Sequence, residues 1–309
     1  MDERALIARL APFAAPASHG LGDDCAWLPQ GEGRWLVVSS DSSVAGVHFP
    51  PAVRGAAASE RAVRTAASDL AAKGATPIGM LSSLHLPHSM ESIWVEAVAL
   101  GVADAAQALR LPLLGGDTVR HGGPLAISVT VLGEVERAAP LLRSGARPGD
   151  GVWASGPIGE GAFGLRYLQG DPGLPDPTGD DLLRWEEKFL RPEPRFDLRA
   201  GLGAATASLD ISDGLVADAR RLAEASGVGL AVEAAAVPLT DTSRRWVGGD
   251  PGRWTALATA GDDYELLVTF PAGHSPHGWT RIGEVVPGEG AQFLWQGAPL
   301  SIASGGWEH

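Results

Sequence analysis

Aspartates that directly follow short apolar runs are the residues of this sequence best suited to chemistry. They lie among glycine and serine at five places: Asp23-Asp24, Asp41, Asp117, Asp210 with Asp213, and Asp262-Asp263. Carboxylates at strand ends project into the loop region, where ligands collect in α/β folds. Several carboxylates at one spot repel one another unless cations hold them, and Mg²⁺ is the hard cation that carboxylates share with phosphate oxygens. The pattern therefore favours a site for metal-bound phosphates.

Ordinary turn chemistry is the alternative for each of these aspartates. Gly-Asp and Asp-Gly pairs are common in turns, because Asp bonds its own backbone and Gly adopts a positive φ. A single pair indicates a turn, whereas five clusters that each abut a strand favour function, although spacing alone does not prove that they converge. The glycine-rich stretch at residues 155–161 also has two interpretations, since it suits either a phosphate at a helix N-terminus or a simple turn.

Three further positions have two interpretations each. Asp69 lies inside an expected helix, where a solvated face with an ion pair to Lys73 four residues later is the simpler interpretation. His48 suits a core histidine better than a ligand contact when it is considered without its neighbours. Arg143 and Arg147 are suited to binding phosphate, but a solvated linker face is the commoner case.

The charge balance restricts how phosphates could be held. The chain carries 24 basic and 37 acidic residues, a net charge of −13, and such a chain repels nucleic-acid backbones. Only Lys73 and Lys188 are lysines, and neither fits the G-x-x-x-x-G-K-[ST] pattern, which excludes a P-loop NTPase. Arginines, backbone N–H groups or metal ions must therefore neutralise any bound phosphate.

Length and composition predict a globular protein of the cytoplasm. The chain has 309 residues, of which 45% are hydrophobic and 20% charged, and no apolar run reaches the ~18 residues of a membrane helix. The N-terminal residues lack the pattern of a secretory signal. The single cysteine, Cys25, excludes an internal disulfide and a cysteine-rich zinc site, and is best interpreted as a small buried hydrophobe.

The elements that must position the aspartates form two α/β halves. We expect one domain over residues 1–136, a linker rich in proline and glycine over 137–150, and a second domain over 151–309. The apolar patterns predict strands at residues 35–39, 79–86, 111–114, 125–135, 151–154, 209–211 and 264–270, and helices at 59–73, 90–110 and 215–226. In the helix at 90–110, Ser89 is the expected cap, and one apolar stripe is expected along Ile93, Ala97, Leu100 and Ala108.

Seven segments, in this order, resemble the thiamine-monophosphate kinase family. That family belongs to a superfamily with aminoimidazole ribonucleotide synthetase and selenophosphate synthetase. The matching segments are residues 22–26, 40–49, 68–75, 115–118, 155–156, 210–215 and 261–266. They span nearly the whole chain, and the Val-x-Gly-Val-His-Phe segment at 44–49 separates this family from its superfamily relatives.

The resemblance implies a two-domain fold of the aminoimidazole ribonucleotide synthetase type, of class α/β (α+β). Its N-terminal α/β domain would pair into a homodimer, and its C-terminal α/β sandwich would complete a cleft. ATP and thiamine monophosphate would bind there with several Mg²⁺ ions. The γ-phosphoryl group would pass directly to the substrate phosphate, with no protein nucleophile, and yield thiamine diphosphate and ADP.

The resemblance also implies roles for individual residues, and for Asp69 and His48 it replaces the simpler interpretations. The expected metal ligands are Asp24, Ser39, Ser40, Asp41, Asp69, Asp117, Asp210 and Asp213. The expected ATP contacts are Gly116, Asp117, Arg143 and Ser212. The expected contacts of thiamine monophosphate are His48, Asp262 and Trp307, of which Trp307 would stack on the ring system. The chain departs from the family in having Asp262 where Glu is common, and in lacking an aromatic near Leu100.

Two other functions remain as alternatives. One is another ATP-dependent enzyme of the same superfamily, but a selenophosphate synthetase would need a reactive Cys and a Lys in its N-terminal segment, and no Lys precedes residue 73. The other is a non-catalytic metal- or nucleotide-binding relative. That alternative predicts erosion of the acidic set, yet every expected aspartate is present.

Overall fold

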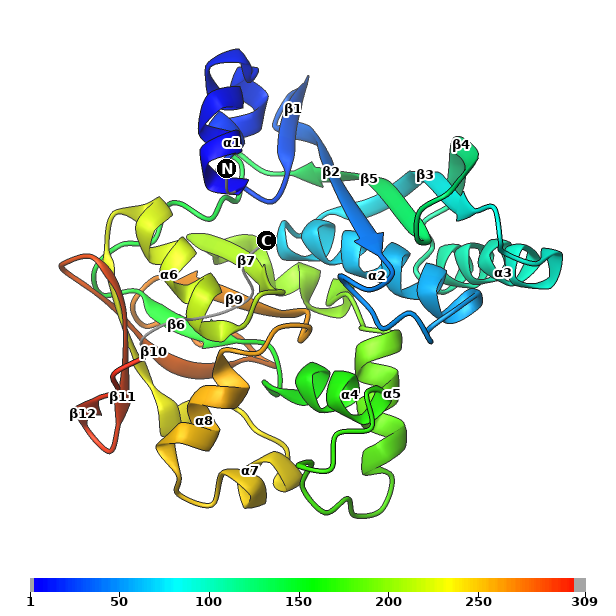
Figure 1. Cartoon of the computed structure of the whole chain (residues 1–309). Helices are drawn as coiled ribbons and strands as arrows, with labels where there is room; N and C mark the ends of the chain where they lie inside the picture. The colour runs from blue at the N-terminus through cyan, green and yellow to red at the C-terminus, as the bar shows by residue number, and fades with distance from the viewer. Residues whose placement is uncertain (1–2, 303–309) are drawn as a thin grey trace.

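The structure is a computed structural model that describes residues 3–302. It contains two β-sheets with one long helix, α2 (Ala56–Ala72), between them (Figure 1). Within the described residues, no helix combines the length and the apolar character needed to cross a membrane.

The first sheet has five strands in the order β1-β2-β5-β3-β4. Their bounds are β1 Ala26–Gly31, β2 Arg34–Val44, β3 Thr76–Pro87, β4 Leu113–His121 and β5 Ala126–Glu136. All neighbours are antiparallel except β3 and β4, which run parallel and are joined by helix α3 (Ser92–Ala108). Strand β4 therefore lies at one edge of the sheet (Figure 1).

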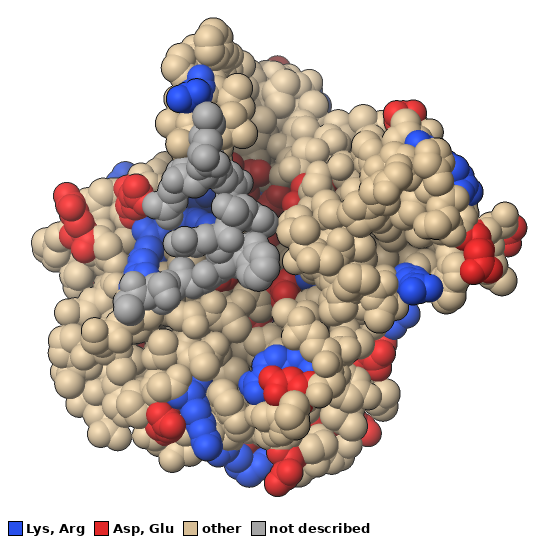
Figure 2. Space-filling model, viewed as in Figure 1, with Lys and Arg blue, Asp and Glu red and all other residues tan. Residues whose placement is uncertain are grey.

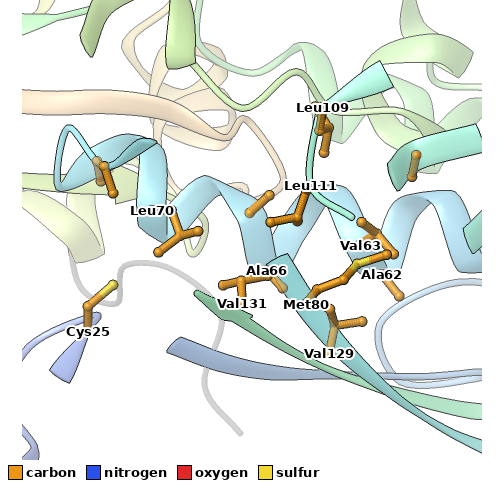
Figure 3. Packing of buried hydrophobic residues seen from close by; sticks show 14 of the residues in the cluster. Cys25, Ala62, Val63, Ala66, Leu70, Met80, Leu109, Leu111, Val129 and Val131 are labelled. Carbon is orange, nitrogen blue, oxygen red and sulfur yellow. The ribbon is translucent and has the colours of Figure 1, made fainter. Parts of the chain in front are cut away.

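Helix α2 is buried almost all round because its side chains are small. Ala62 and Ala66 have almost no exposed surface, and together with Val63 and Leu70 they pack against Met80, Val129 and Val131 of the sheet (Figure 3). Small side chains allow close approach of helix and sheet, and the interior is packed without large voids. The helix ends at Ala72, close to the predicted end at residue 73, and Gly74 beyond it has a φ of +69°, which suits glycine.

The second sheet has seven strands in the order β12-β11-β8-β10-β6-β9-β7. Their bounds are β6 Gly151–Ala154, β7 Ala207–Ile211, β8 Gly229–Glu233, β9 Glu265–Phe270, β10 Thr280–Val286, β11 Gly290–Trp295 and β12 Ala298–Pro299. The helices of this half are α4 Glu160–Leu168, α5 Asp181–Leu190, α6 Leu215–Ser226, α7 Asp241–Val247 and α8 Pro251–Ala258. Its core is separate from the first and gathers Val152, Leu209, Leu222 and Leu267.

Shorter elements complete the chain. Helix α1 (Glu3–Leu10) and the 3₁₀ turns η1 (Ala11–Phe13) and η2 (Pro16–Leu21) precede β1. The 3₁₀ segments η3 (Phe196–Ala204) and η4 (Ala234–Ala236) belong to the second half.

Two predictions about α3 are wrong. The helix begins after Glu91, so Ser89 is not its cap. Its buried face is Val98, Gly101, Val102 and Ala105, whereas Ile93 and Leu100 are exposed. Gly101 decides the orientation, because a Cβ there would lie 2.3 Å from Ala56 O, so α2 and α3 touch at this glycine and not along the bulkier side chains.

The strand expected at 111–114 does not stop at the two glycines that follow it, Gly115 and Gly116. Strand β4 continues through them to His121. Gly116 pairs with Ser82 of β3, and a Cβ on Gly116 would lie 1.9 Å from Ser82 O. The glycine therefore permits close contact between strands and does not terminate one.

Candidate active site

A cleft between the two halves of the molecule contains most of the residues expected to do chemistry. Its volume is about 1380 Å³. Acidic side chains are gathered in the hollow between the halves (Figure 2). The lining residues that the sequence predicted are Asp24, Ser39, Ser40, Asp41, His48, Asp69, Arg143, Asp210, Ser212, Asp213 and Asp262.

Three aspartates from distant segments converge at one wall of the cleft, and we call them the acid cluster. Asp24 precedes β1, Asp69 lies in the last turn of α2, and Asp210 lies in β7. One carboxylate oxygen from each lies within 4.8 Å of the others. Ser39 of β2 joins them, since its Oγ lies 2.5 Å from Asp69 Oδ2 and 3.0 Å from Asp24 O.

The acid cluster is electrostatically unbalanced. Burial, and then the negative charges of Asp210 and Asp24, raise the pKa of Asp69 well above its usual value. Burial and the charge of Asp24 raise the pKa of Asp210 to about 7. Burial alone would also raise the pKa of Asp24, but the charges of Lys73 and Arg143 outweigh it and lower that pKa. These carboxylates need a further cation to be ionised together.

Lys73 is the internal cation of this wall. Its ammonium is fully buried and lies 2.8 Å from Asp23 Oδ1, 2.5 Å from Asp24 Oδ2 and 2.9 Å from the carbonyl of Ser208. The simpler interpretation of Asp69 as part of a solvated face paired with Lys73 is therefore wrong. Arg143 is the second cation, donating from Nε to Asp24 Oδ1 at 2.8 Å, while its backbone N–H binds Asp23 Oδ2 at 2.6 Å.

The donor set of the acid cluster fits a divalent cation such as Mg²⁺. It offers converging carboxylate oxygens, of which those of Asp69 and Asp210 belong to groups with raised pKa values, and hard cations prefer oxygen ligands. Asp41 lines the cleft beside them, with Oδ2 3.2 Å from Thr65 Oγ1 and Oδ1 2.7 Å from Ser42 N. Asp213 lines the cleft as well, and Arg221 forms an ion pair with it.

Ser40 and Ser212 contribute differently from the aspartates. Ser39 and Ser40 are adjacent in β2, so their side chains point to opposite faces of the sheet. The hydroxyl of Ser40 hydrogen-bonds Thr130 Oγ1 on β5 at 3.0 Å. The backbone N–H groups of Ser212 and Asp213 both donate to Asp218 Oδ2 at 3.1 Å. Burial raises the pKa of Asp218 to about 7.

Another part of the cleft lining contains His48, Asp262 and Arg61, and we call it the substrate wall. His48 is half-buried here and not in the core, and its Nδ1 accepts a hydrogen bond from Val44 N at 3.0 Å. Arg61 of α2 forms an ion pair with Asp262, which belongs to the loop before β9. The hydroxyl of Tyr264 lies 3.4 Å from Asp262 Oδ1, the oxygen that Arg61 also contacts.

The glycine-rich stretch at 155–161 binds the chain's own carboxylate. Both oxygens of Asp263 lie 2.9 Å from Gly159 N, and Oδ1 lies 3.4 Å from Gly161 N. Asp263 is fully buried and stabilises the N-terminus of α4, where N–H groups lack helical partners. In this structure the stretch is a turn around a buried carboxyl group, whose pKa is raised to about 8 by burial, so the two aspartates of the Gly-Asp-Asp motif have separate roles.

Gly116 and Asp117 lie away from the cleft of their own chain. Both are exposed on β4 and neither is among the lining residues. Arg147 is also exposed, whereas Cys25 is buried in the first core as expected. Trp307 lies outside the described residues.

Sequence reasoning missed the polar stripe of α2. Arg61, Thr65, Asp69 and Lys73 follow one another at intervals of four residues, so they lie along one side of the helix. Each contacts a different group: Arg61 pairs with Asp262, Thr65 bonds Asp41, Asp69 belongs to the acid cluster, and Lys73 pairs with Asp23 and Asp24. The signal was present, because polar residues at helical spacing interrupt an alanine-rich helix that is otherwise buried.

The comparisons with known proteins agree with this geometry. Residues 22–135 match the family described as AIR synthase related protein, N-terminal domain, and residues 147–296 match AIR synthase related protein, C-terminal domain. The chain is 36% identical to a thiamine-monophosphate kinase of Caulobacter vibrioides, over 100% of this chain and 90% of that protein. It is 34% identical to a thiamine-monophosphate kinase of Escherichia coli, over 94% and 91%. A solved structure of AaThiL complexed with AMPPCP and TMP superposes with a TM-score of 0.87 at 31% identity, covering 100% of this chain and 97% of that one.

Proposed function

This chain belongs to the thiamine-monophosphate kinase family of AIR synthase related proteins, and we propose that it transfers the γ-phosphoryl group of ATP to the phosphate of thiamine monophosphate. The products are thiamine diphosphate and ADP. The observation that carries the proposal is the acid cluster, which lies in the cleft of a fold that matches a kinase structure bound to AMPPCP and TMP. The chain is therefore an ATP-dependent phosphotransferase.

The acid cluster is the proposed holder of Mg²⁺, through Asp24, Asp69 and Asp210, with Asp41 and Asp213 beside them. Bound Mg²⁺ would neutralise phosphate oxygens and align the donor with the acceptor. Phosphoryl transfer depends mainly on alignment and charge neutralisation, so no side chain has to act as a nucleophile. The acceptor oxygen of a phosphate is already ionised near neutral pH, which removes the need for a strong general base.

Arg143 and Ser212 are the proposed ATP contacts within the cleft. Arg143 is part-buried beside Asp24, and its planar guanidinium suits phosphate oxygens. Ser212 lies in the turn after β7, next to the acid cluster. These two contacts support a polyphosphate path along the acid cluster, with the substrate wall left for thiamine monophosphate.

His48 and Asp262 are the proposed contacts of the thiamine moiety. Both line the cleft in the substrate wall, and the side chain of Asp262 is 22% exposed. A carboxylate there suits the positive charge and amino group of the thiamine ring system. Trp307 is the proposed stacking partner from the resemblance to the family, and Trp307→Ala should weaken binding of thiamine monophosphate with little effect on ATP.

We propose that the protein works as a homodimer and that the first sheet forms its interface. The first sheet leaves large apolar side chains exposed on β3 and β4, namely Ile78, Leu81, Leu113, Leu114 and Val119. Contiguous apolar surface of this kind marks an interaction site. Asp117 and Gly116 lie on the same edge strand, so a second copy is the proposed route by which they reach a cleft.

A chromatographic assay tests the proposed reaction. Purified protein with ATP, Mg²⁺ and thiamine monophosphate should yield thiamine diphosphate and ADP in equal amounts, and a chelator should abolish both. Free thiamine in place of thiamine monophosphate should give no product. ADP without thiamine diphosphate would mean a different acceptor, and neither product would leave only a binding function.

Sedimentation tests the proposed interface. Leu114 is 60% exposed, so Leu114→Glu should convert dimers to monomers without unfolding the chain. If Asp117 acts in the partner's cleft, the monomer should also lose activity. A monomeric wild-type protein with full activity would refute the proposal.

A further inference from the structure

Arg61 is a buried cation at the substrate wall that the transfer reaction itself does not require. Its side chain is 2% exposed although it is charged at every physiological pH. It belongs to α2 in the first half of the chain, yet it reaches α5 and the loop before β9 in the second half. A buried charge of this kind is costly unless it is paired and hydrogen-bonded.

The guanidinium of Arg61 connects three separate segments. It donates through Nη1 to the carbonyl of Phe189 at 2.5 Å and through Nη2 to the carboxylate of Asp262, and Nη2 lies 3.4 Å from the carbonyl of His48. Its Cζ lies 4.0 Å from the centre of the Phe189 ring and 5.8 Å from that of Tyr264. The planar fork of an arginine can serve all these partners, whereas a lysine ammonium cannot.

Asp262 is held in a conformation that needs support. Its φ is +70°, and that of Tyr264 is +49°, both in the left-handed region that few non-glycine residues adopt and that is least favourable for the bulky Tyr264. Two hydrogen bonds hold the backbone: Asp262 N donates to Ser212 O, and Tyr264 N donates to Ile211 O, each at 2.8 Å. Arg61 adds the support of the side chain, so the position of the carboxylate is fixed at both ends.

The contacts of Asp262 leave one carboxylate oxygen for a ligand. Arg61 and Tyr264 both bond Oδ1, and no hydrogen bond between described residues ends on Oδ2. The side chain is 22% exposed and lines the cleft. Arg61 therefore holds Oδ1 while the carboxylate remains accessible from the cleft.

We propose that Arg61 is a positioning residue for thiamine monophosphate, which holds Asp262 and the His48 segment together as one recognition edge across the two halves of the chain. This inference rests on the proposed function. Arg61 acts through Asp262 and the backbone of His48, so it sets the affinity for thiamine monophosphate and leaves ATP binding and the transfer step nearly unchanged.

Binding and kinetics of Arg61→Met and Arg61→Lys test this role. Calorimetric titration should show about 10- to 100-fold weaker binding of thiamine monophosphate to Arg61→Met, the range expected for losing a hydrogen bond between charged groups. The KM for thiamine monophosphate should rise in parallel, while the Kd for AMPPCP and kcat at saturating substrate stay within about threefold. Arg61→Lys should recover part of the affinity, because it restores the ion pair but not the fork.

Arg64→Met is the matched control. Arg64 lies on the same helix, its side chain is 10% exposed, and it bonds Glu193 at 3.1 Å, but it does not line the cleft. Its loss should leave both affinities unchanged. In the double variant Arg61→Met with Asp262→Asn, the two losses should be less than additive, since both act on one contact.

Two results would overturn the proposal. One is a folded Arg61→Met protein with the affinity of the wild type for thiamine monophosphate, and the other is an equal loss of AMPPCP binding. If Arg61→Met does not fold, Arg61→Lys alone decides, because unchanged affinity in that variant excludes a role for the fork. Failure of the proposed function is distinguishable, since the wild-type protein would then bind no thiamine monophosphate.

Discussion

The two walls of the cleft balance their carboxylates in different ways. In the acid cluster three aspartates converge, and the two nearby cations, Lys73 and Arg143, bind Asp24, so Asp69 and Asp210 keep raised pKa values. On the substrate wall the carboxylate of Asp262 has a cation of its own, the guanidinium of Arg61. An unbalanced wall can bind a cation from outside, whereas a balanced wall can only orient a ligand.

The largest effect should follow a change in the unbalanced wall. Asp210→Asn removes a proposed metal ligand at nearly constant volume, and kcat should fall at least about 1,000-fold because charge neutralisation is lost. The metal-free protein should keep its stability, since the substitution also removes a repelled charge. Turnover and the midpoint of thermal unfolding are the measurements, and normal turnover would contradict the metal assignment.

Removing the internal cation should affect stability as well as chemistry. Lys73→Met leaves Asp23 and Asp24 without their shared partner, and the free energy of unfolding should fall by about 3–5 kcal/mol in urea denaturation. Lys188→Met is the comparison, because Glu265, the partner of Lys188, is also bonded by Arg195. A smaller loss in Lys73→Met than in Lys188→Met would show that the acid cluster does not depend on Lys73.

A change in the balanced wall should alter affinity and not the transfer step. Asp262→Asn keeps the shape but loses the charge, so the KM for thiamine monophosphate should rise about tenfold with kcat nearly unchanged. Steady-state kinetics with each substrate varied in turn measure this. Should kcat fall as far as in Asp210→Asn, the distinction between the two walls would be lost.

A further effect of the unbalanced wall should be a dependence of stability on pH in the metal-free protein. The pKa of Asp210 is raised from 3.8 to about 7, so the folded chain retains a proton that the unfolded chain releases. Through Asp210, the free energy of unfolding should therefore fall as pH rises from about 4 to about 7. Thermal unfolding with a chelator measures the fall, and Asp210→Asn should reduce it. Saturating Mg²⁺ favours the ionised form, so it should reduce the fall too, and an unchanged fall would argue against metal binding at Asp210.

The sequence determined much of the fold because its patterns are local. The alanine-rich run from residue 59 predicts α2, the run at 151–154 predicts β6 with its bounds, and residues 215–226 predict α6. Local patterns could not predict which face of α3 is buried, because that depends on the contact of Gly101 with α2. The acidic residues were visible as motifs after apolar runs, and the ordered resemblance assigned them to one family. Their expected place at strand ends is wrong for Asp41 and Asp117, which lie within β2 and β4.

Only the tertiary structure decided how these residues act together. Asp24, Asp69 and Asp210 are far apart in sequence, and they meet because α2 lies between two sheets. The same packing buries Lys73 against Asp24 and carries Arg61 to Asp262, pairings that no local spacing specifies. The physical reason is that burial fixes which charges share a low-dielectric space, and that space exists only once the two halves have packed.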